Sequence, residues 1–144
     1  MGLLSTLTAS TPVRRSRGQG LIASGLLLSN GVIHVVAFPD HFQVAAYIGV
    51  LFLLLALATV PLAIGIGADS QIAWDIAAAM SGIAIIAYVL ARTLGLPFYH
   101  ESSWLDMMGP VPLGLLSVIV EALFLLMYVR GEPGLARSGR RYFA

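Results

Sequence analysis

Four long apolar segments, separated by short polar stretches, dominate the pattern along the chain. Each is close to or above the roughly 20 residues that a helix needs to cross a hydrocarbon core of about 30 Å. Strands of a membrane barrel would alternate apolar and polar residues, whereas these apolar runs are continuous. The pattern therefore predicts an all-α fold, a four-helix transmembrane bundle. The predicted spans are 20–38, 43–67, 72–96 and 111–129, in one membrane domain (20–130) between two basic tails (1–19 and 131–144).

The composition agrees with a membrane protein. Of the 144 residues, 58% are hydrophobic and only 10% are charged, whereas about 25% are charged in a soluble domain. The mean hydropathy of +0.90 also excludes a disordered chain. The lack of cysteine excludes disulfides and thiolate metal sites, and the net charge of +1 predicts no nucleic-acid partner. The expected partners are the lipid bilayer and other membrane subunits or further copies of the chain.

The basic residues indicate the orientation of the bundle. All eight are arginines, and seven of them lie before the first span or after the fourth. Because basic residues gather on the cytoplasmic side, we expect cytoplasmic N- and C-termini and a multi-pass protein of the cytoplasmic membrane. The first span is long for a signal peptide and no Ala-x-Ala site follows it, which favours a retained anchor. The seven flanking arginines are Arg14, Arg15, Arg17, Arg130, Arg137, Arg140 and Arg141.

Three ionisable residues lie within the predicted spans, where such groups are costly and often functional. If Pro39 and Pro97 end their helices, the helical rise places His34 and Arg92 about 7 Å below the outer surface. Counted from Pro112, Glu121 lies about 14 Å below it, near the midplane. Glu121 and Arg92 are then within reach of one another and are candidate catalytic residues. The alternatives are an Arg92 that snorkels to the headgroups, a structural bridge between the two, and a His34 that bonds a neighbouring helix.

All three histidines are expected on the outer side, which motivates a metal hypothesis. Imidazole suits copper, zinc and iron. The candidate ligands are His34, His41, His100 and Glu101, with Met107 nearby, and the candidate cofactor is copper or another transition metal. The alternative is that these side chains are polar residues of the membrane interface.

Two kinds of packing signal are present. Both tryptophans are expected at the membrane interfaces, as aromatic anchors. Small residues four apart allow close approach of helices in lipid. These pairs are Gly25 and Ser29, Ala45 and Gly49, and Ala78 and Gly82.

Two stretches resemble a pattern of small integral membrane proteins from GC-rich bacteria. One is Gly31-Val32-Ile33-His34, then Pro39-Asp40-His41-Phe42, then Gly49 and Phe52; the other is Arg92-Thr93-Leu94-Gly95-Leu96-Pro97-Phe98, then an acidic loop and a helix with Glu121. The resemblance covers roughly residues 30–128. It implies a four-helix fold, similar in shape to DoxX-like proteins, with shared positions but no particular activity. The shared positions are His34, His41, Arg92 and Glu121.

Three functions follow as hypotheses. The first is an accessory or metal-handling subunit of a membrane redox system, with the outer-facing histidines as its site. The second is a structural or interaction subunit of a larger membrane complex, without a site of its own. The third is a small membrane-embedded enzyme that acts on a lipid or isoprenoid, with Glu121 as the acid and Arg92 beside it.

Overall fold

Four helices make up almost all of the described structure. The computed structural model describes residues 15–101, 103–104 and 112–131. All four helices are long and apolar enough to cross a membrane, and the described residues form no strand beyond one isolated bridge. The prediction of an all-α, multi-pass membrane protein is confirmed. The helices are α1 (Arg17–Val44), α2 (Ala46–Gly67), α3 (Gln71–Thr93) and α4 (Leu113–Gly131).

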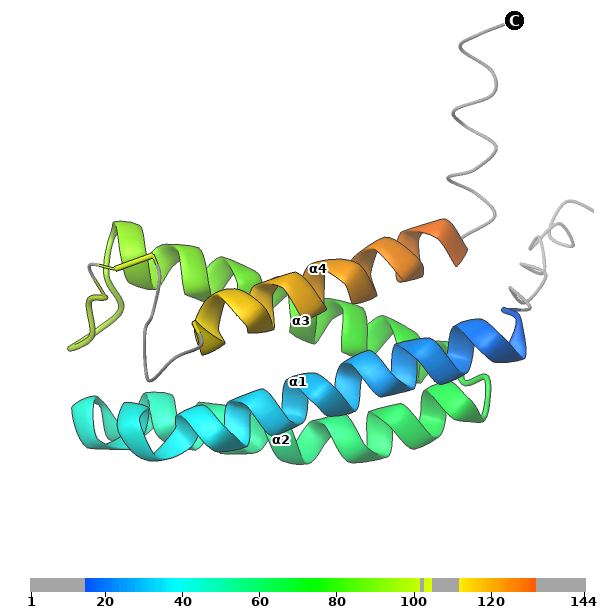
Figure 1. Cartoon of the computed structure of the whole chain (residues 1–144), viewed down its shortest axis with the longest axis horizontal. Coiled ribbons are helices and arrows are strands. Elements are labelled where there is room, and N and C mark those ends of the chain that lie inside the picture. Colours follow the sequence, from blue (N-terminus) through cyan, green and yellow to red (C-terminus); the bar gives the residue numbers. More distant parts are fainter. Residues whose placement is uncertain (1–14, 102, 105–111, 132–144) are drawn as a thin grey trace, which may run out of the picture.

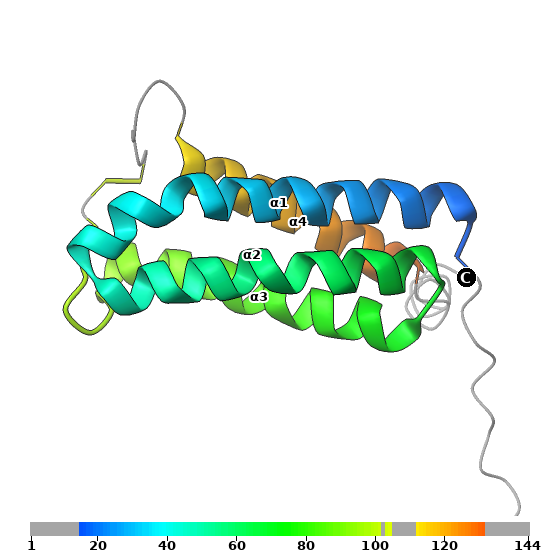
Figure 2. The same cartoon turned by 90° about the horizontal axis from the view of Figure 1, so that it is seen from below.

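The helices form two pairs. α1 and α2 run antiparallel in one layer, and α3 and α4 lie over them in the other (Figure 1). Around the bundle, α1 contacts α2 and α4, and α3 contacts the same two helices. α3 lies beside α2 where the chain connects them and diverges from it toward its other end (Figure 1), whereas α1 and α2 stay side by side along their length (Figure 2). We call the closed end, where α1 and α3 begin, the Trp74 end, and the other the His41 end.

The first helix does not end at Pro39, so the predicted loop at 39–42 is wrong. α1 continues through Pro39 to Val44, and only Ala45 separates it from α2. Proline leaves one carbonyl without its helical hydrogen bond, a loss that transmembrane helices tolerate when neighbouring helices pack there. The N–H of Ala45 bonds back to the carbonyl of His41 at 2.9 Å and closes the helix. His41 therefore lies in the last turn of α1.

The third helix is shorter than predicted. It ends at Thr93 because Gly95 has a φ of +79°, a backbone conformation typical of the residue after a helix. The N–H of Gly95 bonds back to the carbonyl of Leu90 at 2.8 Å. Arg92 consequently lies at the end of α3 and not one turn inside it.

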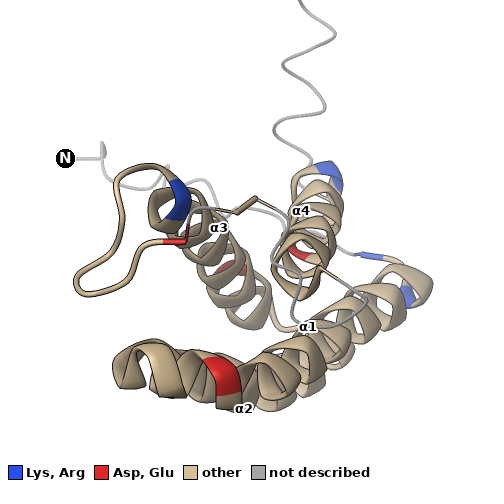
Figure 3. Ribbon diagram, turned by 60° about the vertical axis from the view of Figure 1, so that its left-hand side comes forward, with Lys and Arg blue, Asp and Glu red and all other residues tan. Residues whose placement is uncertain are grey.

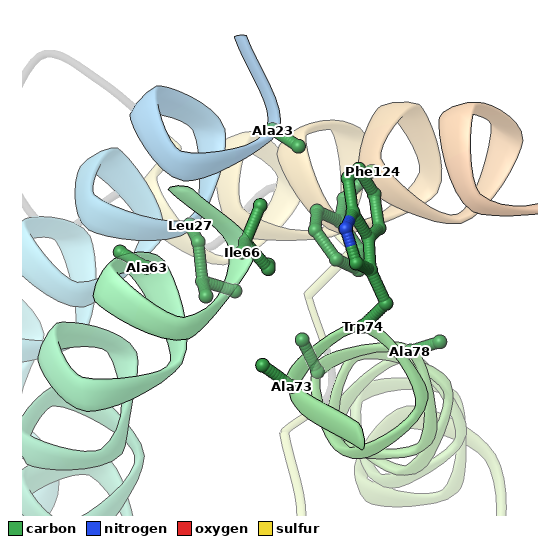
Figure 4. Packing of buried hydrophobic residues seen from close by; sticks show 9 residues of the cluster. Ala23, Leu27, Ala63, Ile66, Ala73, Trp74, Ala78 and Phe124 are labelled. Atoms are coloured by element: carbon green, nitrogen blue, oxygen red, sulfur yellow. The ribbon is translucent and has the colours of Figure 1, made fainter. Parts of the chain in front are cut away.

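The best-packed core lies at the Trp74 end (Figure 4). Trp74 is 1% exposed and stacks on Phe124 of α4, with ring centroids 5.5 Å apart. The guanidinium of Arg15 covers the indole at 4.2 Å and donates to Gln71 at 2.8 Å. Trp74 is thus a core residue and not an interfacial anchor, and Arg15 closes the bundle in addition to its expected role in orientation. Ala23, Leu27, Ala63, Ile66, Ala73, Ala77 and Ala78 complete the cluster.

Most of the remaining helix surface is apolar and exposed. Large aliphatic side chains cover the outside of all four helices, and few charges interrupt them (Figure 3). Such a surface is unfavourable in water and matches the hydrocarbon of a bilayer. The helices therefore adhere to one another through close packing and polar contacts, since lipid supplies little hydrophobic drive for association.

The closest approach between α1 and α2 depends on glycines. A methyl group at Gly31 would lie 2.4 Å from the hydroxyl oxygen of Thr59, and one at Gly49 would lie 2.5 Å from Cβ of Phe42. Gly25 and Gly82 have no such neighbour within 4 Å. Of the small residues predicted to mediate packing, Gly49 does so, whereas Gly25 and Gly82 lie in open space. Gly31 also lies at a close contact between α1 and α2, although the spacing pattern did not identify it.

We predict that Gly31→Ala destabilises the bundle by about 1–3 kcal/mol, because the added methyl group forces α1 away from α2. Gly25→Ala, on the same helix, should leave stability unchanged. Unfolding of the protein in detergent micelles by added dodecyl sulfate measures both. Combining Gly31→Ala with Thr59→Ala should restore part of the loss, and equal stability of the two glycine variants would contradict the packing described.

Candidate functional site

A cavity of about 360 Å³ lies between all four helices toward the His41 end. Its wall is mainly aliphatic and aromatic, with side chains such as Leu55, Met80 and Val118. This volume falls at the lower end of the 300–1,000 Å³ range of small-molecule sites, about the size of a compact ligand or part of a longer one. Four ionisable residues from three helices line it, namely His34, His41, Arg92 and Glu121.

A buried polar network joins α1 to α4 beside the cavity. The side-chain amide of Asn30 donates to a carboxyl oxygen of Glu121 at 2.9 Å. The hydroxyl of Ser117 donates to the amide oxygen of Asn30 at 2.8 Å. All three residues are at most 8% exposed. Because water is excluded here, each of these groups depends on the others for its hydrogen bonds.

The two histidines of α1 use the same local hydrogen bond. Nδ1 of His34 lies 2.9 Å from the carbonyl oxygen of Asn30, and Nδ1 of His41 lies 2.9 Å from that of Ala37. Both residues are buried, and the ring of Phe52 from α2 packs against both imidazoles. Each bond fixes its ring against the helix that carries it, so the two imidazoles present fixed edges to the cavity.

The depths of the buried groups differ from those predicted. With α1 extended past Pro39, His34 lies ten residues before Val44, about 15 Å along the helix. Glu121 lies eight residues after Leu113, about 12 Å along α4. Because Asn30 bonds Glu121 and lies four residues before His34 on α1, Glu121 lies about one helical turn deeper than His34, and the polar groups of α1 and α4 meet near the middle of the bundle.

Arg92 is positioned by the end of α3. Its Nε donates to the carbonyl of Ser103 at 3.0 Å, and its Nη1 donates to the carbonyl of Tyr88 at 3.4 Å. The guanidinium also lies 3.6 Å above the ring of Tyr88. Among the residues that the structure describes, no ion pair joins it to Glu121, whose carboxyl is held by Asn30. The structural bridge between Arg92 and Glu121, one of the alternatives above, is therefore not formed, and the two residues line the same cavity instead.

A short turn closes the cavity at the His41 end. Leu96 and Tyr99 exchange backbone hydrogen bonds of 2.7 and 2.9 Å, and both side chains line the cavity. Tyr47 of α2 donates its hydroxyl to the carbonyl of Pro97, which ties the turn to α2. Tyr88 of α3 donates to the carbonyl of Trp104 at 2.7 Å. Tyr47 of α2 thus holds the turn, and Tyr88 of α3 holds the segment that follows it.

The predicted metal ligands do not gather into one group. His100 is exposed and does not line the cavity, and the carboxylate of Glu101 accepts from the N–H of Ser103 at 3.0 Å. His34 and His41 are two turns apart on α1, about 10 Å, whereas two ligands of one metal ion lie within about 4 Å. In the described ranges, no three His, Asp or Glu side chains are placed to hold a metal. Met107 lies outside the described residues.

Asn30 and Ser117 are the site residues that sequence reasoning missed. Neither carries a charge, so neither stands out in a count of ionisable groups. A usable signal exists in their spacing. Asn30 precedes His34 by four residues and Ser117 precedes Glu121 by four, which places each pair on one helix face. Paired polar residues at this spacing, inside apolar spans, mark the faces that meet in the bundle.

The fold and the cavity define a class: a four-helix, multi-pass membrane protein with a largely apolar internal cavity that several ionisable side chains line. Comparison with protein-family models, with curated proteins and with solved structures finds no match. The resemblance to small DoxX-like membrane proteins thus stays a prediction.

We predict that Asn30→Ala destabilises the bundle by about 1–2 kcal/mol, because it leaves Glu121 and Ser117 without their buried partner. Glu121→Leu should have a similar effect, since it removes the acceptor of the Asn30 amide. Glu121→Gln keeps an acceptor oxygen and should unfold close to the wild type. Dodecyl sulfate titration compares the three, and a Glu121→Gln variant as unstable as Glu121→Leu would contradict this account of the network.

Proposed function

We propose that the protein binds a long-chain lipid or isoprenoid in the cavity and acts on its polar end. The observation that carries the proposal is the composition of the cavity wall. Aliphatic and aromatic side chains form most of it, and His34, His41, Arg92 and Glu121 supply a few ionisable groups. Sites for apolar ligands combine such a wall with a small number of fixed polar groups that orient the ligand.

The size and position of the cavity favour a ligand that comes from the bilayer. A volume of about 360 Å³ accommodates the polar end and the first part of a long chain. Leu51 of α2 and Ile83 of α3 line the cavity and are also 50% and 67% exposed on the outside of the bundle. They mark an opening toward lipid between the two diverging helices, through which the rest of the chain extends.

Acid–base chemistry is the action that the polar groups support. Glu121, His34 and His41 can each give or take a proton, and all three line the same cavity. Asn30 holds one oxygen of the Glu121 carboxyl, which fixes the orientation of the other. Arg92, at the end of α3, adds a fixed positive charge to the same wall.

The two other hypotheses have less support. A metal-handling role needs ligands close together, and the described residues provide no such group. A purely structural subunit does not require four ionisable residues around one cavity, because each of them is costly in hydrocarbon. The lipid-binding hypothesis accounts for both the apolar wall and the ionisable groups.

Filling the cavity tests the proposal. Ala87 lines it from α3, whereas Ala79 of the same helix is exposed outside it. We predict that Ala87→Phe lowers labelling by a photoreactive C20 isoprenoid in phosphatidylcholine nanodiscs about tenfold, because an overpacked site costs about 1–3 kcal/mol. Ala79→Phe should leave labelling unchanged.

Peptide mapping gives the second readout of the same experiment. Label on lining residues of α2 and α3 is the expected result. Label spread evenly over the lipid-facing surface, or equal labelling of Ala87→Phe and the wild type, would contradict the proposed function.

A further inference from the structure

The balance of hydrogen-bond donors and acceptors in the cavity limits which polar group of a ligand fits there. A backbone carbonyl oxygen only accepts hydrogen bonds, so Nδ1 of His34 and of His41 carries the hydrogen in its bond to the preceding turn. In a neutral imidazole with hydrogen on Nδ1, the other nitrogen, Nε2, is an acceptor. Neither Nε2 makes a hydrogen bond to a residue that the structure describes, and both rings line the cavity.

The neighbouring donors already have acceptors within the protein. The Asn30 amide donates to Glu121, and the Ser117 hydroxyl donates to Asn30. Arg92 donates to the carbonyls of Ser103 and Tyr88. Around His34 the cavity therefore offers a ligand mainly acceptors, namely two imidazole nitrogens and the Glu121 carboxyl, while the guanidinium of Arg92, with its five N–H groups, lies at the end of α3. A ligand that is itself only an acceptor would leave these buried groups without a partner.

We propose, on the basis of the proposed function, that the ligand is a lipid alcohol whose hydroxyl donates to Nε2 of His34. The hydroxyl is the smallest group that supplies the missing donor, and it is uncharged, which suits a mainly apolar wall. His34 is 5% exposed and lies about one turn from the level of Asn30 and Glu121, so the hydroxyl lies inside the cavity and the chain extends toward Leu51 and Ile83. A phosphate end bound at His34 would place its oxygens against the Glu121 carboxyl and the acceptor nitrogens, and the guanidinium of Arg92, which would attract it, lies farther away at the end of α3.

Three C20 probes that share one chain test the inference. They are geranylgeraniol, its methyl ether, which lacks the donor, and its monophosphate. Binding is measured with the purified full chain in phosphatidylcholine nanodiscs, by retention of the radiolabelled probe. We expect the alcohol to bind about tenfold or more tightly than the ether, because an unsatisfied buried acceptor costs about 1–3 kcal/mol and 1.4 kcal/mol is a factor of ten. The monophosphate should bind more weakly than the alcohol.

The variant His34→Phe identifies the acceptor. It keeps an aromatic ring of similar shape but removes Nε2, so it should abolish the preference for the alcohol over the ether. His100→Phe, at an exposed residue outside the cavity, should keep the full preference. Circular dichroism and the elution volume in detergent check that both variants fold, and the comparison of the three probes on the wild type needs no variant.

The outcomes separate this inference from the proposed function. Equal binding of alcohol and ether, tighter binding of the phosphate, or a preference that survives in His34→Phe would overturn the lipid-alcohol assignment while the lipid-binding function stands. Failure of all three probes to bind would overturn both. A preference for the alcohol that is lost only in His34→Phe supports the inference.

Discussion

The hydrogen bond between Asn30 and Glu121 is the contact on which the site depends. In hydrocarbon a carboxyl group needs a partner inside the protein, and Asn30 supplies it from the facing helix at 2.9 Å. Ser117 completes the network by donating to Asn30. Because this network joins α1 to α4 near the middle of the bundle, it sets the depth at which His34 and Glu121 face the same cavity. Apolar residues in these places would pack α1 on α4 without fixing that depth.

The two ends of the bundle differ in how their helices pack. At the Trp74 end, the stacked pair of Trp74 and Phe124, covered by Arg15, packs between the helices. At the His41 end, α3 diverges from α2 and leaves the cavity between them (Figure 1). Most of the buried apolar core therefore lies at the Trp74 end, and the cavity lies toward the other end. The turn from Leu96 to Tyr99 limits the opening along the bundle axis, which agrees with the proposed entry of the ligand from the bilayer.

The sequence predicts the fold well, because four continuous apolar runs of this length leave few alternatives to membrane-spanning helices. It also identifies four of the cavity residues, since His34, His41, Arg92 and Glu121 are ionisable groups in or beside apolar spans. It does not predict that α1 continues past Pro39, because that depends on packing by the neighbouring helix. The sequence does not reveal the role of Asn30, because that role depends on the fold placing this uncharged side chain opposite Glu121. The exposed position of His100 depends on the turn that follows α3, which hydropathy does not describe.

The proposed function requires that the polar end of a membrane lipid reaches the groups around Glu121. Infrared difference spectroscopy of the protein in phosphatidylcholine nanodiscs, with and without geranylgeraniol, tests it most directly. The account predicts a change in a carboxyl band on addition of the probe, and the loss of that change in Glu121→Gln. A difference spectrum without any carboxyl band, or the same band in Glu121→Gln, would contradict it.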